Sequence, residues 1–522
     1  MNGNIYLVGF MGSGKTTVGN RLARALNRHF VDMDEILEKR FGKPIREVFI
    51  ESGEPAFRAK ESALLEKISK QERRVVATGG GVPEREANRK LMKATGVVVH
   101  LDADLRASQR RLGASQRAAR PLWTEKSSVQ TLFERRKSLY ADCDFSVQAN
   151  GNRPERVTEA ILQGLIPENR FVAKLGSSKC PIVATVNAPE VIADVVKERK
   201  TALVTDRTVL RLHGQRYRSL LERSVVVTVS PGEKSKTLAN SRRIYEALIA
   251  NEFDRDDLLI ALGGGVVTDL AAFAASTYKR GMDFVLVSTT LVGCVDAAIG
   301  GKAAVNVGSV KNVVGSFSTP RAVVLDIAAL RTLGPRQRSE GLVEAYKTGL
   351  VASPELTELV EHHASALMKG DLALLARVAQ LSARAKADVV SGDFRESGLR
   401  RILNFGHTFG HAVESHHHFR VSHGRAVALG MRVAAEISGA RGLISSDAVG
   451  RINSTLDVIA PYEVAMPPLD EAWKIMQQDK KIRRGKIVFV LLEELGRATC
   501  VEDLSKAELA AAIRRVEESQ FG

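Results

Sequence analysis

The sequence is poor in cysteine and in aromatic residues. Its 522 residues include four cysteines, which are widely separated and form no CxxC pair: Cys143, Cys180, Cys294 and Cys500. A disulfide framework or a zinc cluster held by thiolates is therefore not expected. Aromatic residues make up only 5% of the chain, too few for a surface that stacks the bases of a nucleic acid.

Long apolar runs are also missing. Stretches such as LLIALGGGVV are too short and too rich in glycine to span a bilayer. The first residues, MNGNIYLVGFMGSGKTT, lack the basic segment, the apolar segment and the small-residue cleavage site of a secretory signal. The sequence therefore predicts a cytoplasmic protein without a membrane partner.

Negative charge is in deficit, and the formal net charge is +16. Such an excess attracts nucleic acids, anionic membrane surfaces or small anions. Because the chain has no basic low-complexity tail and few aromatic residues, nucleic acid is not expected as a partner. Small anionic metabolites explain the charge more simply.

The chain is too long for one ordinary hydrophobic core. Apolar runs typical of strands alternate with amphipathic segments in the first third and again up to residue 335, which predicts parallel sheets covered by helices on both faces. Strand signals fade from about residue 338, and helical periodicity takes over. The expected fold class is α/β, and the expected domains are residues 1–168, 169–335 and 336–522, the last mostly helical.

A phosphate-binding loop follows the first expected strand, NIYLVGF, and precedes the expected helix KTTVGNRLARALN. The segment Gly9–Thr16 fits GxxxxGK(S/T) at every fixed position. In such a loop Lys15 reaches the β- and γ-phosphate oxygens, and the Thr16 hydroxyl is a ligand of Mg²⁺. The pattern predicts a three-layer P-loop kinase domain that uses ATP with Mg²⁺. Its expected nucleotide-binding residues are Gly12, Ser13, Gly14, Lys15, Thr16 and Thr17.

Charged residues after the loop are candidates for holding the phosphoryl acceptor. Asp32 and Asp34 end the expected strand HFVDMD with both side chains on one side, so one carboxylate can serve Mg²⁺ and the other an acceptor hydroxyl. The glycine triplet 79–81 lets a ligand approach the backbone closely. The guanidinium groups of Arg58 and Arg136 suit a carboxylate.

Five arginines with no acidic residue among them fall between residues 106 and 120: Arg106, Arg110, Arg111, Arg117 and Arg120. They are interpreted as a lid that closes over ATP, brings positive charge to the phosphoryl group and excludes water. The alternative is a solvated helix face.

Together these pieces resemble shikimate kinase over essentially all of residues 1–166. The resemblance rests on GFMGSGKTTVG, DMD, FRxxE, GGG, the RPL of the lid and an arginine before Leu139-Tyr140. It implies shikimate as the acceptor, Asp34 as the catalytic carboxylate and Asp32 near Mg²⁺. Shikimate would contact Asp34, Arg58, Gly80 and Arg136. ATP would contact Arg153 and a lid arginine, either Arg117 or Arg120.

The middle of the chain contains a second glycine cluster. The expected strand DLLIALG runs into residues 263–265 and then a helix, an arrangement that suits a pyrophosphate, although it is not GxGxxG. The charged turn PGEKSK can reach ribose hydroxyls. Thr289 and Thr290 end another expected strand at the carboxyl edge of the sheet, where open α/β sheets bind ligands.

Histidines are concentrated between His362 and His423. His407 and His411 are four residues apart and can share one face of a helix, a familiar metal-binding arrangement. The alternative is polar surface, which is how the other neighbouring histidines are interpreted. A third ligand has to come from elsewhere, and the candidate is the carboxylate within GLVEAYKTGL.

Residues 175–515 resemble 3-dehydroquinate synthase in PGEKSK, GGGVVTDLAAF, YKRG, TTLVGCVDAAIGGKAAVN, KNVVGSF, EGLVEAYKTG, GLRRILNFGHTFGHAVE and DKK. The resemblance implies NAD⁺ and Zn²⁺ or Co²⁺ as cofactors. The implied metal ligands are Glu344, His407 and His423. The implied NAD contacts are Glu233, Lys236, Gly264, Gly265, Asp269, Thr289, Thr290, Lys302 and Lys311.

The implied substrate is a heptulosonate phosphate, which is cyclised to 3-dehydroquinate with release of phosphate. Its carboxylate would contact Lys386 and Arg400. Its phosphate would contact Lys302, Asn312, Asn404, His411 and one lysine of the DKK segment, Lys480 or Lys481. The implied catalytic side chains are Asp296, Lys302, Lys347 and His411.

Arg280 matches an arginine that reaches the substrate phosphate from a neighbouring subunit, so the resemblance also implies a homodimer. The rival interpretation within enzymes is a kinase for another acceptor joined to another sugar-phosphate cyclase. A rival of another class, a basic binding protein with degenerate enzyme halves, predicts missing catalytic residues, whereas both sets are complete.

Overall fold

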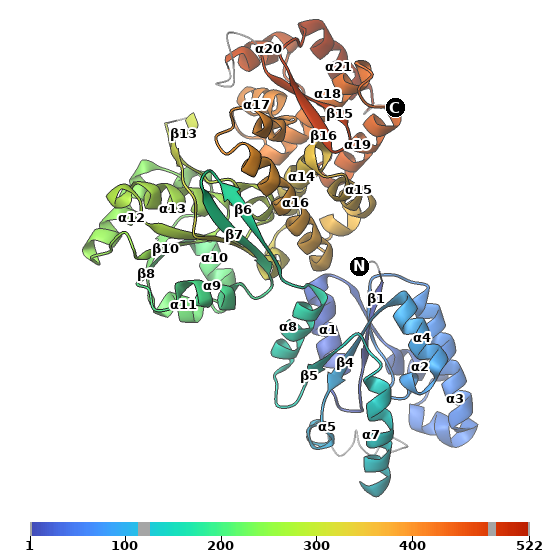
Figure 1. Cartoon of the computed structure of the whole chain (residues 1–522). Coiled ribbons are helices and arrows are strands. Elements are labelled where there is room, and N and C mark those ends of the chain that lie inside the picture. Colours follow the sequence, from blue (N-terminus) through green and yellow to red (C-terminus); the bar gives the residue numbers. More distant parts are fainter. Residues whose placement is uncertain (1–2, 113–125, 309, 479–486, 520–522) are drawn as a thin grey trace. The chain divides into compact units, whose positions relative to one another are not determined.

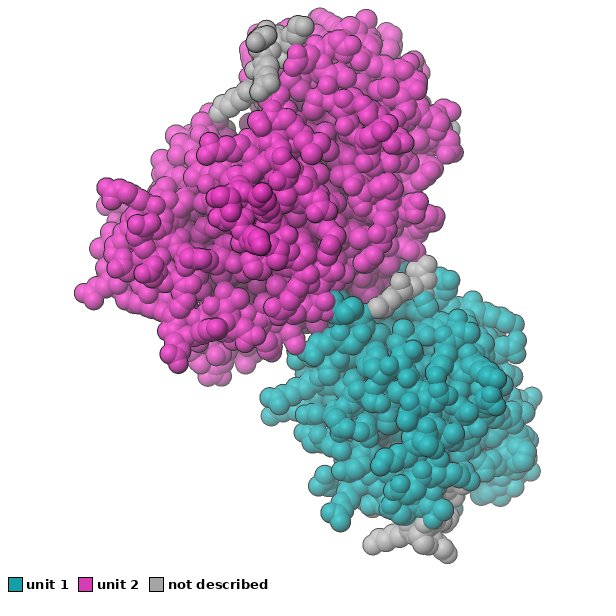
Figure 2. All heavy atoms as spheres, viewed as in Figure 1, with its two compact units in different colours: residues 1–167 teal, residues 168–522 magenta. Residues whose placement is uncertain are grey.

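The computed structural model describes residues 3–112, 126–308, 310–478 and 487–519. The chain forms two compact units, Met1–Pro167 and Glu168–Gly522 (Figure 2). The division of the second unit at residue 335 stays a prediction. None of the described helices combines the length and the apolar composition needed to cross a membrane.

The first unit is built on a parallel sheet in the order β2-β3-β1-β4-β5. Its strands are β1 (Asn4–Val8), β2 (His29–Asp32), β3 (Arg74–Ala77), β4 (Gly96–Asp102) and β5 (Phe145–Gln148). Its described helices are α1 (Lys15–Leu26), α2 (Met33–Phe41), α3 (Ile45–Ser69), η1 (Val82–Glu84), α4 (Glu86–Thr95), α5 (Leu105–Arg111), α7 (Lys126–Tyr140) and α8 (Pro154–Leu165). Helices α1 and α8 pack together on one face of the sheet, and α2, α3 and α4 cover the other (Figure 1).

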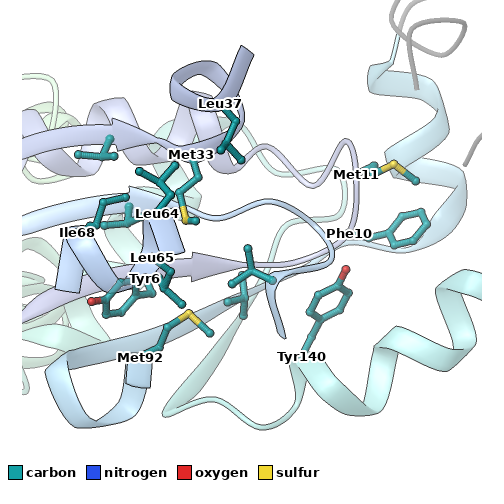
Figure 3. Packing of buried hydrophobic residues seen from close by; sticks show 14 of the residues in the cluster. Tyr6, Phe10, Met11, Met33, Leu37, Leu64, Leu65, Ile68, Met92 and Tyr140 are labelled. Atoms are coloured by element: carbon teal, nitrogen blue, oxygen red, sulfur yellow. The ribbon is translucent and has the colours of Figure 1, made fainter. Parts of the chain in front are cut away.

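Alternation along the strands gives this unit its core. Tyr6 and Val8 of β1 face Leu64, Leu65 and other apolar residues of α3 (Figure 3). Burial of such side chains contributes about 1.5–3 kcal/mol each. Because β1, β2 and β3 are parallel, their carboxyl ends lie at one edge of the sheet. The P-loop follows β1, Asp32 ends β2, and the glycine triplet follows β3.

The second unit begins with a larger sheet in the order β6-β7-β14-β11-β10-β8-β9, parallel except for the β6–β7 pair. Its strands are β6 (Asn169–Leu175), β7 (Ser178–Thr185), β8 (Thr201–Asp206), β9 (Ser224–Val229), β10 (Leu258–Gly263), β11 (Asp283–Ser288) and β14 (Ala322–Asp326). Accompanying helical elements are α9 (Ala188–Val196), α10 (Arg207–His213), α11 (Arg218–Glu222), η2 (Glu233–Ser235), α12 (Leu238–Ala250), α13 (Gly265–Thr277), η3 (Tyr278–Arg280), η4 (Gly293–Ala297) and η5 (Ile327–Thr332). A hairpin of β12 (Lys302–Val307) and β13 (Val310–Phe317) follows β11 and precedes β14 along the chain.

The rest of the second unit is mostly helical. Its helical elements are α14 (Pro335–Ala352), α15 (Pro354–Met368), α16 (Leu372–Gly392), η6 (Leu399–Asn404), α17 (His407–His416), α18 (His423–Ala440), α19 (Ser446–Ile459), α20 (Leu469–Gln478) and α21 (Lys506–Glu518). The hairpin of β15 (Phe489–Glu494) and β16 (Arg497–Val501) is an addition that the fading strand signal did not predict. The expected α/β architecture, with a helical last part, is confirmed.

Candidate active sites

The P-loop lies between β1 and α1, as its motif predicts. Gly12 and Gly14 adopt φ angles of 79° and 100°, which side-chain-bearing residues rarely adopt. Lys15 Nζ donates to the carbonyl oxygens of Gly9 and Phe10, at 2.7 and 3.1 Å. The Thr16 hydroxyl donates to Asp32 Oδ2 at 2.7 Å. The two expected Mg²⁺-associated residues are therefore adjacent.

The sequence analysis expected Asp34 to end a strand beside Asp32, and this prediction is wrong. Strand β2 ends at Asp32, whose carboxylate caps α2 by accepting from the backbone N–H groups of Asp34 and Glu35. Aspartate is a favoured N-cap, and this local bond competes with continued strand. Asp34 therefore lies in the first helical turn, with its carboxylate directed at the glycine triplet.

The triplet forms the floor of a charged cradle. A Cβ atom at Gly79 would lie 2.3 Å from Glu61 Oε1 and 2.9 Å from Asp34 Oδ1. One at Gly81 would lie 2.2 Å from the Arg58 guanidinium. Only glycine allows these side chains to approach the backbone this closely. The triplet therefore lies against two carboxylates, Glu61 and Asp34, and against Arg58, all of which come from earlier segments of the chain.

Arg136 completes the cradle from α7. Its side chain is 2% exposed, and its Nε donates to Glu84 Oε1 at 2.8 Å. Its Nη2 atom is buried and has no hydrogen-bond partner among the described residues. A buried guanidinium N–H without an acceptor is costly, and an anionic ligand would supply the missing acceptor.

Glu61 balances the charge of Arg58, at 2.8 Å between Oε2 and Nη1. Burial raises the pKa of Glu61 to about 6, although the Arg58 guanidinium opposes this shift. Arg58 also contacts Glu54 at 3.0 Å. Both arginines are thus oriented by carboxylates before any substrate binds.

The remaining residues predicted at the nucleotide site are exposed or lie outside the described residues. Thr17 is exposed on α1, and Arg153 is the exposed N-cap of α8. Arg111 donates to the carbonyl oxygen of Ser13 at 3.1 Å, which attaches α5 to the P-loop. Arg117 and Arg120 lie outside the described residues.

In the second unit, three helices bring Glu344, His407 and His423 together. Their ligand atoms all lie within 4.8 Å of one another. Glu344 Oε1 is 3.1 Å from His423 Nε2 and 3.6 Å from His407 Nε2. Glu344 projects from the buried middle of α14, and the two histidines are the first residues of α17 and α18. His411, one turn after His407, has its ring 5.7 Å from that of His407.

The donor set fits a divalent metal ion. Glu344 Oε1 is buried and makes no hydrogen bond of good geometry among the described residues. Burial would raise the pKa of Glu344, but Lys347, His407 and His423 outweigh it and hold the pKa well below its usual range. Two imidazoles and one carboxylate form a set that binds catalytic zinc with one position left open.

Alternating charges continue from these three residues into the interior. Lys347 Nζ lies 2.5 Å from Glu344 Oε2 and 3.9 Å from Asp296 Oδ1. Lys386 Nζ lies 2.6 Å from that same Asp296 oxygen. Burial lowers the pKa of Lys386 to about 8, although Asp296 opposes the shift. Arg400 is 3% exposed and donates to the carbonyl oxygens of Gly300 and Phe394.

The expected phosphate ligands are only partly brought together. Lys302 and Asn404 both contact Glu396, Asn404 at 2.9 Å between Nδ2 and Oε1. Asn312 instead accepts from Lys236, which also pairs with Asp269. Lys480 and Lys481 lie outside the described residues.

The expected NAD-binding residues line the carboxyl edge of the larger sheet. A Cβ atom at Gly264 would lie 2.8 Å from the Thr290 methyl group, so β10 and β11 are in close contact here. Thr289 is buried, and Gly265 begins α13. Glu233 accepts from Asn306 at 2.7 Å.

Two further expected residues come from elements outside this sheet. Lys311, expected at NAD, lies 3.3 Å from Glu414 of α17. Arg280 is exposed in η3 with a φ angle of 66°.

Several carboxylates that hold these cations were not found from the sequence: Glu84, Glu396 and Glu414. Glu84 and Glu396 come from irregular segments without periodicity. Glu414 could have been found, because it follows His407 and His411 at helical spacing, seven and three residues later.

The fold and the two charged sites define a chain with two enzymes, a P-loop kinase and a synthase of the lyase class. The shikimate kinase family profile matches residues 11–166. Profiles of the N-terminal and C-terminal parts of 3-dehydroquinate synthase match residues 226–340 and 341–482.

Relatives extend the likeness over the whole chain. A bifunctional shikimate kinase/3-dehydroquinate synthase of Thermotoga maritima is 32% identical, covering 95% of this chain and 97% of the relative. A 3-dehydroquinate synthase of Psychrobacter cryohalolentis is 40% identical over 62% of this chain and 91% of its own. The solved 2-epi-5-epi-valiolone synthase of Streptomyces hygroscopicus subsp. jinggangensis 5008, with NAD⁺ and Zn²⁺ bound, is 28% identical with a TM-score of 0.61, covering 67% of this chain and 99% of that one.

The chain belongs to the family of bifunctional shikimate kinase/3-dehydroquinate synthases. It is therefore an enzyme of the shikimate pathway with a kinase part and a lyase part, and the resemblance stated from the sequence is confirmed.

Proposed function

We propose that the first unit phosphorylates shikimate with ATP. The observation that carries this proposal is the cradle of Asp34, Arg58 and Arg136 on the glycine triplet, beside a P-loop. Arg58 and Arg136, whose Nη2 atom has no hydrogen-bond partner among the described residues, would bind the shikimate carboxylate together. Asp34 would accept the proton of the attacking hydroxyl, and Lys15 would leave its loop carbonyls for the phosphates.

Mg²⁺ would be held by Thr16 and Asp32 and, when bound, neutralises charge on the phosphates. The two side chains lie in contact, within reach of one ion. The Asp34 carboxylate, in the first turn of α2, is directed at the glycine triplet and not at this pair. Metal binding and proton acceptance are thus assigned to different carboxylates.

We propose that the second unit cyclises 3-deoxy-D-arabino-heptulosonate 7-phosphate to 3-dehydroquinate and releases phosphate. The observation that carries this proposal is the convergence of Glu344, His407 and His423, whose ligand atoms lie within 4.8 Å of one another. Among the described residues, the buried Glu344 Oε1 atom has no hydrogen-bond partner. Zn²⁺ or Co²⁺ on these residues would polarise a substrate hydroxyl, and bound NAD⁺ would take and return a hydride.

The surrounding side chains would bind the two anionic ends of the substrate. Lys386 and Arg400 would hold the carboxylate, and Lys302, Asn404 and His411 the phosphate. The pKa of Asp296 is lowered: burial opposes the shift, but Lys386 and Lys347 outweigh it. The carboxylate is thus ionised, and its Oδ1 atom would hold the Lys386 ammonium group in place.

A cyclase for a substrate without a carboxylate is the competing function. The buried cations Lys386 and Arg400, 6% and 3% exposed, argue against it. Such a substrate would add no anion beside these two cations, although Arg400 donates directly to two backbone carbonyl oxygens.

Two assays test these proposals on the purified full chain. ADP formation should depend on shikimate, and phosphate release should depend on the heptulosonate phosphate, NAD⁺ and the metal. A seven-carbon sugar phosphate lacking the carboxylate serves as the comparison in the second assay. Equal or faster turnover of that analogue would overturn the assignment of Lys386 and Arg400.

We also propose that the enzyme works as a homodimer in which Arg280 acts on the partner's substrate. Arg280→Gln and Glu344→Ala would each be inactive as synthases. Mixing the two variants under conditions of subunit exchange should restore activity, because a mixed dimer contains one site with both residues intact. No recovery, with exchange verified by mass-tagged subunits, would contradict action between subunits.

A further inference from the structure

Glu414 occupies a position between the proposed metal centre and the NAD-binding part. It lies on α17, and its side chain is only 6% exposed. One carboxylate oxygen, Oε2, is 3.5 Å from His423 Nδ1, and the other, Oε1, is 3.3 Å from Lys311 Nζ. None of the roles assigned above uses this carboxylate.

The His423 ring needs a hydrogen-bond partner that fixes its orientation if it is to bind a metal ion. Its side chain is 43% exposed, whereas that of His407 is 12% exposed. His407 Nδ1 has the carbonyl oxygen of Phe405 at 3.3 Å. A neutral imidazole binds a metal through one nitrogen, and the partner of the other nitrogen fixes the tautomer and the ring orientation. At His423, Glu414 is placed to accept from Nδ1 and to leave the lone pair of Nε2 directed at Glu344.

A nearly buried carboxylate is stable only if its charge is compensated. Lys311 supplies this charge from β13, across from α17, and its ammonium group also lies 4.6 Å from the centre of the Phe419 ring. Figure 1 shows β13 and α17 at neighbouring positions. The β12–β13 hairpin thereby connects the NAD-binding part to the helix that supports His423.

We propose that Glu414 is a positioning residue that orients His423 for metal binding, and that Lys311 holds Glu414 in place. The inference rests on the proposed metal centre, and it adds two residues that act through His423 and not on the substrate. Loss of such a supporting partner typically weakens metal binding by about 10- to 100-fold.

The test is the affinity of metal-stripped full-length protein for Co²⁺, followed by visible absorption in competition with a chelator. Glu414→Gln removes the charge and keeps the shape, and it should raise the Kd about 10- to 100-fold. Lys311→Met should raise the Kd by a smaller factor. The matched control is Glu361→Gln, a carboxylate 10% exposed that pairs with Arg451 and Tyr346 on other helices. It should bind Co²⁺ like the wild type.

Each result has one meaning. Wild-type protein without tight Co²⁺ binding would contradict the metal centre itself. A tightly binding wild type with an equal Kd for Glu414→Gln would overturn only the role of Glu414. An unchanged Kd for Lys311→Met beside a raised Kd for Glu414→Gln would overturn the role of Lys311. Thermal unfolding of every variant separates loss of affinity from loss of fold.

Discussion

The kinase site and the synthase site both hold their cations against carboxylates, but to different depths. In the kinase cradle, Arg58 pairs with Glu61, which is 2% exposed, and with Glu54, which is 42% exposed; Arg136 pairs with Glu84, which is 22% exposed. In the synthase site, Lys347 and Glu344 are 3% and 2% exposed. Water therefore screens the outer kinase carboxylates, Glu54 and Glu84, but neither the Arg58–Glu61 pair nor the synthase pair. Single changes are therefore expected to cost more in the synthase.

The two sites also differ in how their residues are distributed along the chain. The P-loop offers backbone N–H groups, a lysine and a hydroxyl within Gly9–Thr16, so a local motif defines half of the kinase site. The proposed metal ligands of the synthase span residues 344–423 and come from three helices. The first site depends on backbone shape, and the second depends on packing over long sequence distances.

Removing Glu344 should have the largest effect. Glu344→Ala deletes one ligand and leaves Lys347 buried without its partner, so synthase activity should fall by at least about 10³-fold. Kinase activity should be unchanged, because Glu344 lies in the other unit. Phosphate release and ADP formation measured on one preparation check both statements. Glu355→Ala, an exposed change on α15, is the control and should leave both activities intact.

Removing Lys15 tests the kinase site in the same way. Lys15→Met should lower kinase activity by about 10²- to 10³-fold, the usual cost of one cation at a transferring phosphoryl group. Synthase activity on the same preparation should remain at the wild-type level. A kinase that retains most of its activity would contradict phosphate binding at this loop.

The synthase should also lose substrate affinity at high pH. Because the pKa of Lys386 is lowered to about 8 by burial, its positive charge is present below pH 8 and is lost as the pH rises above it. Its attraction for the substrate carboxylate goes with that charge, so kcat/KM should fall, approaching about tenfold per pH unit well above pH 8. Lys386→Arg keeps the charge and should move this decline to higher pH. An identical profile for the variant would assign the decline to another group.

The smallest effect is expected behind the kinase cradle. Tyr140 is buried against His100, and its hydroxyl donates to the Gly80 carbonyl oxygen at 2.7 Å. Tyr140→Phe loses about 0.5–1.5 kcal/mol of positioning, so the KM for shikimate should rise about two- to tenfold with the KM for ATP unchanged.

Tyr6→Phe is the matched control, since Tyr6 belongs to the same apolar cluster (Figure 3). Among the described residues, its hydroxyl bonds to Thr95 and Asn4, away from the cradle. Equal effects of the two changes on the KM for shikimate would show that Tyr140 is merely structural.

The sequence predicted the elements whose apolar pattern is complete. The runs TALVTD and AVVLD coincide with β8 and β14, because strands buried on both faces read as continuous apolar stretches. The β12–β13 hairpin escaped prediction because β13 is exposed along nearly its whole length and carries no alternation. Asp34 was predicted in a strand, but Asp32 caps α2 and so ends the strand before Asp34.

The candidate sites follow the same division. Residues that carry charge within a motif, such as Lys15 and His407, were predicted from the sequence. The carboxylates that pair with other predicted cations, such as Glu84 with Arg136 and Glu396 with Lys302, were not predicted, because ion pairs between distant segments leave no local pattern. Which cation faces which carboxylate is decided by packing alone.

The most direct test of the account is the position of the metal in a crystal of the full chain grown with NAD⁺ and Zn²⁺. Anomalous scattering at the zinc edge should give one strong peak in each second unit, bound by Glu344, His407 and His423. A catalytically active crystal with its peak bound by other residues, or with no peak at these three, would contradict it.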